Sequence, residues 1–362
     1  MQVRMKDVAK KLGVSVATVS KVVRGHPDIS PKTKERVQSI IKELNYRPNL
    51  AARSLRAGRS QMVGLVVPDI LHSFFAEIAK GVGNRIHPKG YNVVLFSSEE
   101  SPELEIEGIE SLLARQVDGL IVATTLTEAQ SDVFRRIDEQ NTPYVLVDRK
   151  IPGLQANYVG VDDEEVGALA TEHLVQRGNR RIAHIQGPEI STAYERLKGY
   201  LGALARHRLT MPAEYIVKVG SSDVIAEDHG LQAMCRLLAL PERPDAVFCF
   251  NDLAALGASR AILKAGLRIP ADIALIGVAN MPHLDMLGVP LSTIDQSSVQ
   301  IGDRAAKLLL RRMESASGSR PTRIYIPPKL IVRASSAIPP STRGEMKKAE
   351  VLPQLVAMER RK

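Results

Sequence analysis

The first 45 residues alternate apolar and polar positions with the period of short helices. The pattern predicts helices over Lys6–Leu12, Ser15–Arg24 and Pro31–Leu44, and Gly13-Val14 is a turn signal between the first two. In the third helix apolar residues recur at i, i+3, i+4 and i+7 from Val37, so one face must pack against a partner. Two helices joined by a tight turn and closed by a third predict a helix-turn-helix module.

From Gln61 onward, short β-branched runs alternate with stretches long enough for helices. The predicted strands are Met62–Val67, Val93–Phe96, Leu120–Ala123, Tyr144–Val147, Ile182–Gln186, Ile216–Val219, Ala246–Phe250 and Ile273–Val278. The predicted helices are Phe74–His87, Pro102–Gln116, Thr127–Gln140, Glu164–Arg177, Ala193–His207, Ile225–Leu238 and Asp252–Ala265. This alternation is typical of doubly wound parallel sheets with helices on both faces. Eight strands divided four and four predict two similar α/β lobes with a ligand cleft between them.

Positive charge is concentrated in the first 60 residues. They hold 14 Lys and Arg against 4 Asp and Glu, whereas the rest of the chain holds 35 basic and 36 acidic residues. A small basic module ahead of a nearly neutral body points to a polyanionic partner for those 60 residues.

The composition also excludes several classes of protein. Basic residues occupy Met1–Gly13, where a signal peptide has its apolar stretch, and no run approaches the roughly 18–20 apolar residues of a membrane span. Cys235 and Cys249 have no clustered histidine, so no zinc site is expected. No catalytic constellation, metal spacing or cofactor motif occurs. We therefore expect a cytoplasmic protein that is not an enzyme and does not contact a membrane.

The second predicted helix carries the candidate nucleic-acid chemistry. In the helical register Ser15, Val16, Ala17, Thr18 and Lys21 project outward from its N-terminal half, the end that enters the major groove in this motif. The hydroxyls of Ser15, Thr18 and Ser20, beside the positive end of a helix, suit phosphate oxygens. The alternative is a basic three-helix bundle that contacts another protein.

Spaced motifs along the chain resemble the lactose-repressor (LacI) family of bacterial transcription regulators. These motifs follow one another in order over about residues 5–338. Several ordered motifs indicate a family more specifically than any single motif does. The matching segments are Met5–Val23, Glu43–Asn49, Ala51–Arg56, Met62–Asp69, Gly187-Pro188, Glu195–Tyr200, Asn251–Ala258 and Leu330–Arg333.

The resemblance implies DNA contacts at particular positions. Val16, Ala17 and Lys21 match residues that read bases, and Ser15, Thr18, Ser20, Ser30 and Thr33 match phosphate contacts. The stretch Asn49–Ala57 matches a hinge helix in the minor groove, with contacts at Asn49, Ala52 and Leu55. Leu55 would wedge between base pairs, since an inserted apolar side chain kinks the duplex. The alternative for Leu55 is a linker residue buried against the body.

The resemblance also implies an effector site in the cleft. Its residues would be Asp69, His72, Phe75, Asp148, Arg196, Ile225, Asn251 and Asn280. The chain has Ala279 where the family usually has an acid, and Ile225 where it has an aromatic ring. An Arg196 without that acid would be less neutralised, which favours a small polar ligand carrying negative charge over a free sugar.

Two further expectations concern the head and the tail. Arg4 stands where many family members have Ser or Thr, and it cannot accept a capping hydrogen bond, so we expect a frayed first helix, partly offset by Asp7. A charged, frayed tail is favoured over an oligomerisation helix at the C-terminus.

The predicted architecture is a small all-α head followed by a two-lobed body like that of periplasmic binding proteins. The expected divisions are the head over 1–47, the hinge helix and linker over 48–60, an N-terminal lobe over 61–161 with 292–322, a C-terminal lobe over 162–291 with 323–338, and a tail over 339–362.

The leading hypothesis is a homodimeric regulator, or a higher oligomer, that binds a pseudo-palindromic double-stranded DNA operator and responds to a small-molecule effector. Two alternatives stay open. One is a ligand-independent architectural DNA-binding protein, and the other is a small-molecule-binding protein with an accessory basic head.

Overall fold

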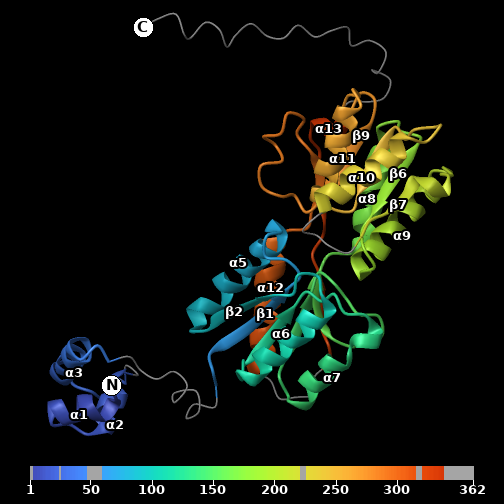
Figure 1. Cartoon of the computed structure of the whole chain (residues 1–362). Helices are drawn as coiled ribbons and strands as arrows, with labels where there is room; N and C mark the ends of the chain where they lie inside the picture. The colour runs from blue at the N-terminus through green and yellow to red at the C-terminus, as the bar shows by residue number, and fades with distance from the viewer. Residues whose placement is uncertain (1–2, 24–25, 47–58, 221–225, 315–319, 338–362) are drawn as a thin grey trace, which may run out of the picture. The chain divides into compact units, whose positions relative to one another are not determined.

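The computed structural model describes residues 3–23, 26–46, 59–220, 226–314 and 320–337. The chain divides into two compact units, Met1–Gln61 and Met62–Lys362 (Figure 1), which we call the head and the body. The predicted hinge residues 48–58 and the tail over 339–362 lie outside the described residues.

The head contains the three predicted helices, α1 (Met5–Leu12), α2 (Val16–Val23) and α3 (Pro31–Glu43). They surround a small apolar core whose fully buried members include Val8, Val19 and Val37. The turn between α1 and α2 is placed at Gly13, whose φ of 66° lies in the left-handed region that favours glycine.

The start of α1 is stabilised by Asp7 and not by Arg4. The Arg4 side chain has no acceptor, but the Arg4 backbone N–H donates to Asp7 Oδ2 at 2.8 Å. This is one half of a capping box, and the Asp7 carboxylate also lies at the positive end of the helix. The expected weakness at Arg4 is thus partly compensated three residues later.

The N-terminal lobe of the body is built on a six-stranded sheet with the order β11-β5-β4-β3-β1-β2. The six strands all run parallel to their neighbours. Their bounds are β1 Met62–Val67, β2 Asn92–Ser97, β3 Gly119–Val122, β4 Tyr144–Val147, β5 Asn157–Gly160 and β11 Arg323–Tyr325. The helices of this lobe are α5 Ser73–Ile86, α6 Pro102–Ala114, α7 Asp132–Glu139 and α12 Ser298–Glu314, with short 3-10 helices η1 His87–Lys89 and η2 Glu128–Gln130.

The C-terminal lobe repeats this order, β12-β10-β9-β8-β6-β7, with β12 antiparallel to β10. Its strands are β6 Ile182–Gln186, β7 Ile216–Lys218, β8 Ala246–Cys249, β9 Ala274–Val278, β10 Ser292–Asp295 and β12 Lys329–Ile331. Its helices are α8 Asp163–Gln176, α9 Ser191–Arg206, α10 Ala226–Leu238, α11 Asp252–Lys264 and α13 Ala334–Ala337, with the 3-10 helix η3 Ala213–Tyr215.

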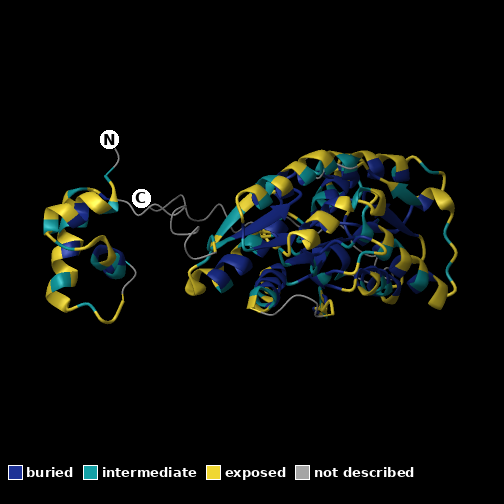
Figure 2. Cartoon of the chain, turned by 90° about the horizontal axis from the view of Figure 1, so that it is seen from below, coloured by how far each residue is buried: buried dark blue, intermediate teal, exposed yellow. Residues whose placement is uncertain are grey.

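Helices cover both faces of each sheet, as the apolar strands predict. In β1, Val63 and Leu65 belong to the apolar cluster that includes α5 and α12, whereas Val66 belongs to the cluster that includes α6 and α7. Successive strand residues therefore face opposite layers. Figure 2 shows the buried strands inside and the exposed faces of the helices outside.

The structure corrects two of the expected lobe boundaries. β10 was expected in the N-terminal lobe but pairs with β9 and β12, and β11 was expected in the C-terminal lobe but pairs with β5. The chain therefore changes lobe between β5 and α8, between β10 and α12, and between β11 and β12. Sequence patterns missed these two strands because three or four residues with polar members do not form an apolar run.

Paired glycines let helices on the sheet faces cross closely. A Cβ at any of them would collide with a backbone carbonyl of the partner helix. The pairs are Gly81 with Gly302 between α5 and α12, Gly167 with Gly199 between α8 and α9, and Gly230 with Gly257 between α10 and α11.

We expect Gly199→Ala to lower the melting temperature of the body, because its methyl group would collide with the Glu164 carbonyl. Overpacking of this kind costs about 1–3 kcal/mol. The matched control is Gly202→Ala on the same helix, where the nearest atom lies 3.6 Å away and belongs to a flexible arginine. The control should keep or raise the melting temperature in calorimetry. Equal losses in both variants would contradict the close crossing.

Candidate functional sites

The exposed side of α2 carries most of the side chains predicted to contact DNA. Ser15, Val16 and Ala17 are exposed, with Val16 at 47%, and Thr18 and Lys21 are half-buried. A contiguous surface of short apolar and hydroxyl side chains thus lies at the N-terminal half of this helix.

Ser20 does not belong to this surface. Its side chain is buried beside Val19 in the head, with 8% exposure. That the Ser20 hydroxyl contacts a phosphate stays a prediction, and little of this side chain is exposed for such a contact. The helical period explains this, because Ser20 follows Val19 by one position and flanks the inward stripe.

Two helix N-termini in the head have the same hydroxyl arrangement. The Thr18 backbone N–H donates to Ser15 Oγ at 3.0 Å, and the Thr33 backbone N–H donates to Ser30 Oγ at 3.3 Å. In each pair the two hydroxyl oxygens are 2.9 Å apart. Each serine caps its helix and keeps a hydroxyl beside the positive helix end, where anions bind.

Lys21 has an acidic partner that the sequence did not reveal. Its Nζ donates to Asp28 Oδ2 at 2.6 Å, and His26 Nδ1 lies 2.6 Å from Asp28 Oδ1. The hydrogen bond from Lys21 is the main cause that lowers the pKa of Asp28. The predicted base-reading ammonium is thus neutralised in the isolated chain. The other predicted contacts, Asn49, Ala52 and Leu55, lie outside the described residues.

A cavity of about 40 Å³ lies between the two lobes of the body. Its walls are the loops at the carboxyl ends of the parallel strands, where open α/β sheets bind ligands. It is lined by His72, Phe74, Phe75, Asp148, Arg149, Ile190, Thr192, Arg196, Phe250, Asn251, Val278, Ala279 and Gln296.

Five of the eight predicted effector residues line this cavity, namely His72, Phe75, Asp148, Arg196 and Asn251. His72 and Asn251 also begin helices: His72 Nδ1 accepts from the Phe74 N–H at 3.3 Å, and Asn251 Oδ1 accepts from the Ala254 N–H at 2.8 Å. Burial is the largest cause that lowers the pKa of His72 to about 4, so its ring is neutral at neutral pH.

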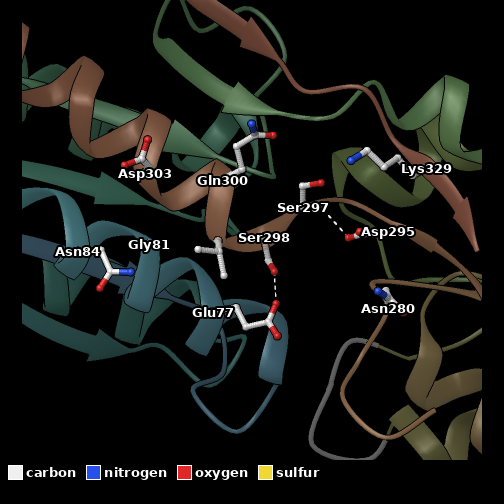
Figure 3. A pocket seen from close by; sticks show the side chains of 11 residues that line it. Glu77, Gly81, Asn84, Asn280, Asp295, Ser297, Ser298, Gln300, Asp303 and Lys329 are labelled. Carbon is white, nitrogen blue, oxygen red and sulfur yellow. Dashed lines mark hydrogen bonds between the residues drawn. The ribbon is translucent and has the colours of Figure 1, made fainter. Parts of the chain in front are cut away.

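The other three predicted residues do not line the cavity. Asp69 is buried and shapes the loop before α5, since its Oδ1 accepts from the Leu71 N–H at 2.7 Å. Ile225 lies outside the described residues. Asn280 lines a separate pocket of about 620 Å³, together with residues of α5, α12, β10 and β12 (Figure 3).

In the cavity, Arg196 is neutralised by an acid that the sequence analysis did not consider. Its Nε donates to Asp163 Oδ1 at 2.8 Å, and its Nη1 donates to the Phe250 carbonyl at 2.6 Å. Asp163 is fully buried, and burial raises its pKa to about 7, against the opposing influence of Arg196. Asp163 supplies the negative charge that the sequence analysis expected Arg196 to lose at position 279, and this removes the reason to favour an anionic ligand.

A second buried guanidinium, that of Arg149, lines the N-terminal side of the cavity. Its two Nη atoms donate to the Glu100 carboxylate, each at 2.7 Å, and its Cζ lies 5.7 Å from the Phe75 ring centroid. Asp148 adds a third buried carboxylate, and its Oδ1 accepts from Gln296 Nε2 at 3.4 Å. These five ionisable groups comprise two cations and three acids.

Sequence reasoning missed Arg149 and Gln296. Both follow strand ends directly, Arg149 two residues after β4 and Gln296 one residue after β10. The rule that ligands bind at the carboxyl ends of parallel strands could have found Arg149. The same rule could not have found Gln296, because the strand that precedes it, β10, was not predicted.

Within the described ranges, no helix has the length and apolar composition needed to cross a membrane. Over the same ranges, no three His, Cys, Asp or Glu side chains are grouped to hold a metal ion.

Comparison with known families places the chain in one class. Residues 60–334 match the periplasmic binding proteins and sugar binding domain of the LacI family, and residues 4–49 match the bacterial regulatory proteins of the lacI family. The protein therefore belongs to the LacI family of bacterial regulatory proteins, as the motifs predicted. The expected fold, an all-α helix-turn-helix head ahead of a periplasmic-binding-protein-like body, is confirmed.

The similar proteins include transcriptional repressors over nearly their full length. The chain is 34% identical over 333 residues to the HTH-type transcriptional repressor PurR of Mannheimia succiniciproducens, covering 91% of this chain and 98% of that protein. The PurR of Haemophilus influenzae (strain PittEE) is also 34% identical, over 337 residues, with the same shares covered.

Solved structures with the same fold include the Lac repressor dimer bound to operator and the anti-inducer ONPF. It matches with a TM-score of 0.82 at 29% identity, over 93% of this chain and 99% of that one. The transcriptional regulator CelR in complex with cellobiose matches with a TM-score of 0.68 at 32% identity, over 92% of this chain and 100% of that one.

We expect Asp28→Asn to raise the affinity of the protein for double-stranded DNA severalfold, because it releases the Lys21 ammonium. Fluorescence anisotropy at several salt concentrations measures this effect. Glu43→Gln is the control, since it removes the same charge from the head but releases Lys11, 2.5 Å from Glu43. An equal gain in both variants would mean that only net charge matters.

Proposed function

We propose that this protein is a sequence-specific transcriptional repressor that binds a pseudo-palindromic operator as a dimer and responds to a small polar effector in the interlobe cavity. The observation that carries the proposal is the match of both the head (residues 4–49) and the body (residues 60–334) to the LacI family. The relatives named above as repressors support it, since they match over 91% of this chain.

The surface of α2 supports sequence-specific reading of DNA. Val16 and Ala17 are short and apolar, which suits the methyl groups of thymine, and Lys21 can donate to guanine O6 or N7. Ser15 with Thr18, and Ser30 with Thr33, would hold the phosphates on either side. Base contacts and phosphate contacts would thus come from neighbouring helix ends.

A similar solved structure, that of the Lac repressor bound to operator, is a dimer, which supports assembly of this protein with a second copy. A symmetric dimer would present two heads to two half-sites, which is why we propose a pseudo-palindromic operator. Localisation in the cytoplasm, where the DNA is, follows from the same proposal.

The charge balance of the cavity favours a neutral polar effector over an anion. Glu100 pairs with Arg149 and Asp163 pairs with Arg196, so neither guanidinium offers an uncompensated positive charge to an anion, and burial raises the pKa of the third acid, Asp148. A ligand with hydroxyl or N–H donors for Asp148, acceptors for the guanidinium groups and an apolar face toward Phe75 fits these side chains.

The two alternative functions make different demands. An architectural DNA-binding protein would need no polar cavity, yet ionisable groups line this one at a desolvation cost. A small-molecule-binding protein with an accessory head would need no exposed α2 surface.

The proposed function is tested by selection of DNA fragments from a random pool by the purified protein. Recovery of one symmetric sequence supports the proposal, and recovery of no common sequence overturns it.

The joint replacement Val16→Ser, Ala17→Gln and Lys21→Thr should change the selected half-site while leaving the salt dependence of binding nearly intact. The reason is that these side chains would meet base edges, and only one of them carries charge. Sequencing of the selected DNA decides the outcome. An unchanged half-site would contradict the assignment of these residues.

The paired replacement Arg196→Met with Asp163→Asn should abolish stabilisation of the protein by its effector. Both partners are changed because Arg196→Ala alone would leave a buried carboxylate unpaired, which costs about 3–5 kcal/mol. Neutral sugars, nucleobases and sugar phosphates are screened by thermal shift on the unaltered protein and then on the double variant. Circular dichroism checks that the variant folds. If the effector still stabilises the double variant, Arg196 does not contact it. If only sugar phosphates stabilise the unaltered protein, the effector is an anion.

A further inference from the structure

The separate pocket that Asn280 lines, which we call the side pocket, shares two backbone segments with the interlobe cavity. Ala279 and Gln296 line the interlobe cavity. Their sequence neighbours Asn280, Asp295 and Ser297 line the side pocket instead. No residue lines both, so the two cavities present different side chains and can hold different ligands.

The side pocket has the size and composition of a site for a polar small molecule. Its volume of about 620 Å³ lies within the usual range of about 300–1,000 Å³ for such sites. Carboxylate, amide and hydroxyl groups make up most of its walls. Figure 3 shows that Glu77 and Asn84 come from α5, Gln300 from α12 and Lys329 from β12. Side chains from separate segments of the chain thus surround one space.

Hydrogen bonds within the walls fix the position of two carboxylates. The Ser298 hydroxyl donates to Glu77 Oε2, and the Ser297 backbone N–H donates to Asp295 Oδ1 at 2.8 Å. Among the described residues, no donor reaches the second oxygen of either carboxylate. Each acid is therefore oriented by one bond and keeps an oxygen that can accept another.

The side pocket carries more negative than positive charge. Asp303 is neutralised, since Arg85 Nε and Nη2 donate to its two oxygens at 2.7 and 2.8 Å. In the described part of the chain, no ion pair includes Glu77, Asp295 or Lys329. This holds although Asp295 and Lys329 are directly opposed in the register of β10 and β12. Two acids and one ammonium remain without charged partners, and this balance attracts a cation.

We propose that the side pocket binds a small primary amine that also carries hydroxyl or carboxylate oxygens, such as an amino sugar or an amino acid. The acids Glu77 and Asp295 attract the ammonium group, which donates to an open carboxylate oxygen. The oxygens of the ligand accept from the Lys329 ammonium and from the amide groups of Asn84 and Gln300. This second ligand site goes beyond the proposed function and requires neither DNA nor an effector.

Calorimetric titration of the full chain with glucosamine and with serine tests the site. Each is compared with its N-acetylated form, which keeps the oxygens and loses the positive charge. At least one of the two amines should bind, and neither N-acetylated form should. Binding of glucosamine alone identifies an amino-sugar site, and binding of serine alone identifies an amino-acid site. Absence of binding by both amines, or equal binding by the N-acetylated form, would overturn the proposal.

Variants of the two acids locate the amine. Glu77→Gln keeps an acceptor for Ser298 and removes the charge, and Asp295→Asn removes the second charge. Each should weaken amine binding severalfold. Together they should weaken it about tenfold or more, the scale of a hydrogen bond to a charged group. If Glu77→Gln fails to fold, Asp295→Asn decides. Unchanged affinity in these variants would overturn the proposal.

The matched charge control is Glu314→Gln, at the end of α12, where the side chain is exposed and does not line the side pocket. It should bind the amine like the unaltered protein. The double variant Arg196→Met with Asp163→Asn distinguishes the two cavities. Retained binding supports the side pocket, and loss there but not in the Glu77 and Asp295 variants would place the amine in the interlobe cavity. The titrations contain no DNA, so their outcome is independent of the proposed repressor function.

Discussion

The body depends on one constraint, which is that parallel strands end together at one edge of a sheet. The loops that follow these ends carry polar side chains that no helix of the same lobe covers. Two lobes with the same strand order bring two such edges together, and the residues after β1, β4, β6, β8 and β9 then meet. The cavity and the repeated lobe changes of the chain both follow from this arrangement.

Burial of charge at that junction requires local neutralisation. Arg149 and Arg196 are both nearly inaccessible to solvent, and each is held by a carboxylate from its own lobe, Glu100 or Asp163. Neither buried cation therefore depends on the other lobe for its neutralisation. The ion pair between Lys150 and Glu195 differs, because it joins the lobes and is partly exposed.

Local patterns predicted most of the secondary structure but not all of the topology. β4 and β6 coincide with their predicted runs because every position in them is buried. The short strands β5, β10, β11 and β12 have exposed or polar positions and were missed, which misplaced two lobe boundaries. In the head, the same period that predicted α2 also places Ser20 beside the inward-facing Val19, although its hydroxyl had been matched to phosphate by residue type.

The sequence by itself determined the helix-turn-helix head, the two α/β lobes and the family, because helical period, buried strands and spaced motifs are local or ordered along the chain. The resemblance to the family also placed Arg196 in the cleft, where it lines the cavity. Only the tertiary structure decided which acid neutralises Arg196, since Asp163 lies 33 positions away in the chain. The tertiary structure also decided which residues Lys150 contacts, that Gln296 lines the cavity and that Asn280 lines a separate pocket. Such contacts depend on how the strand ends of two sheets pack together. A pattern within one segment of the sequence carries no information about that packing.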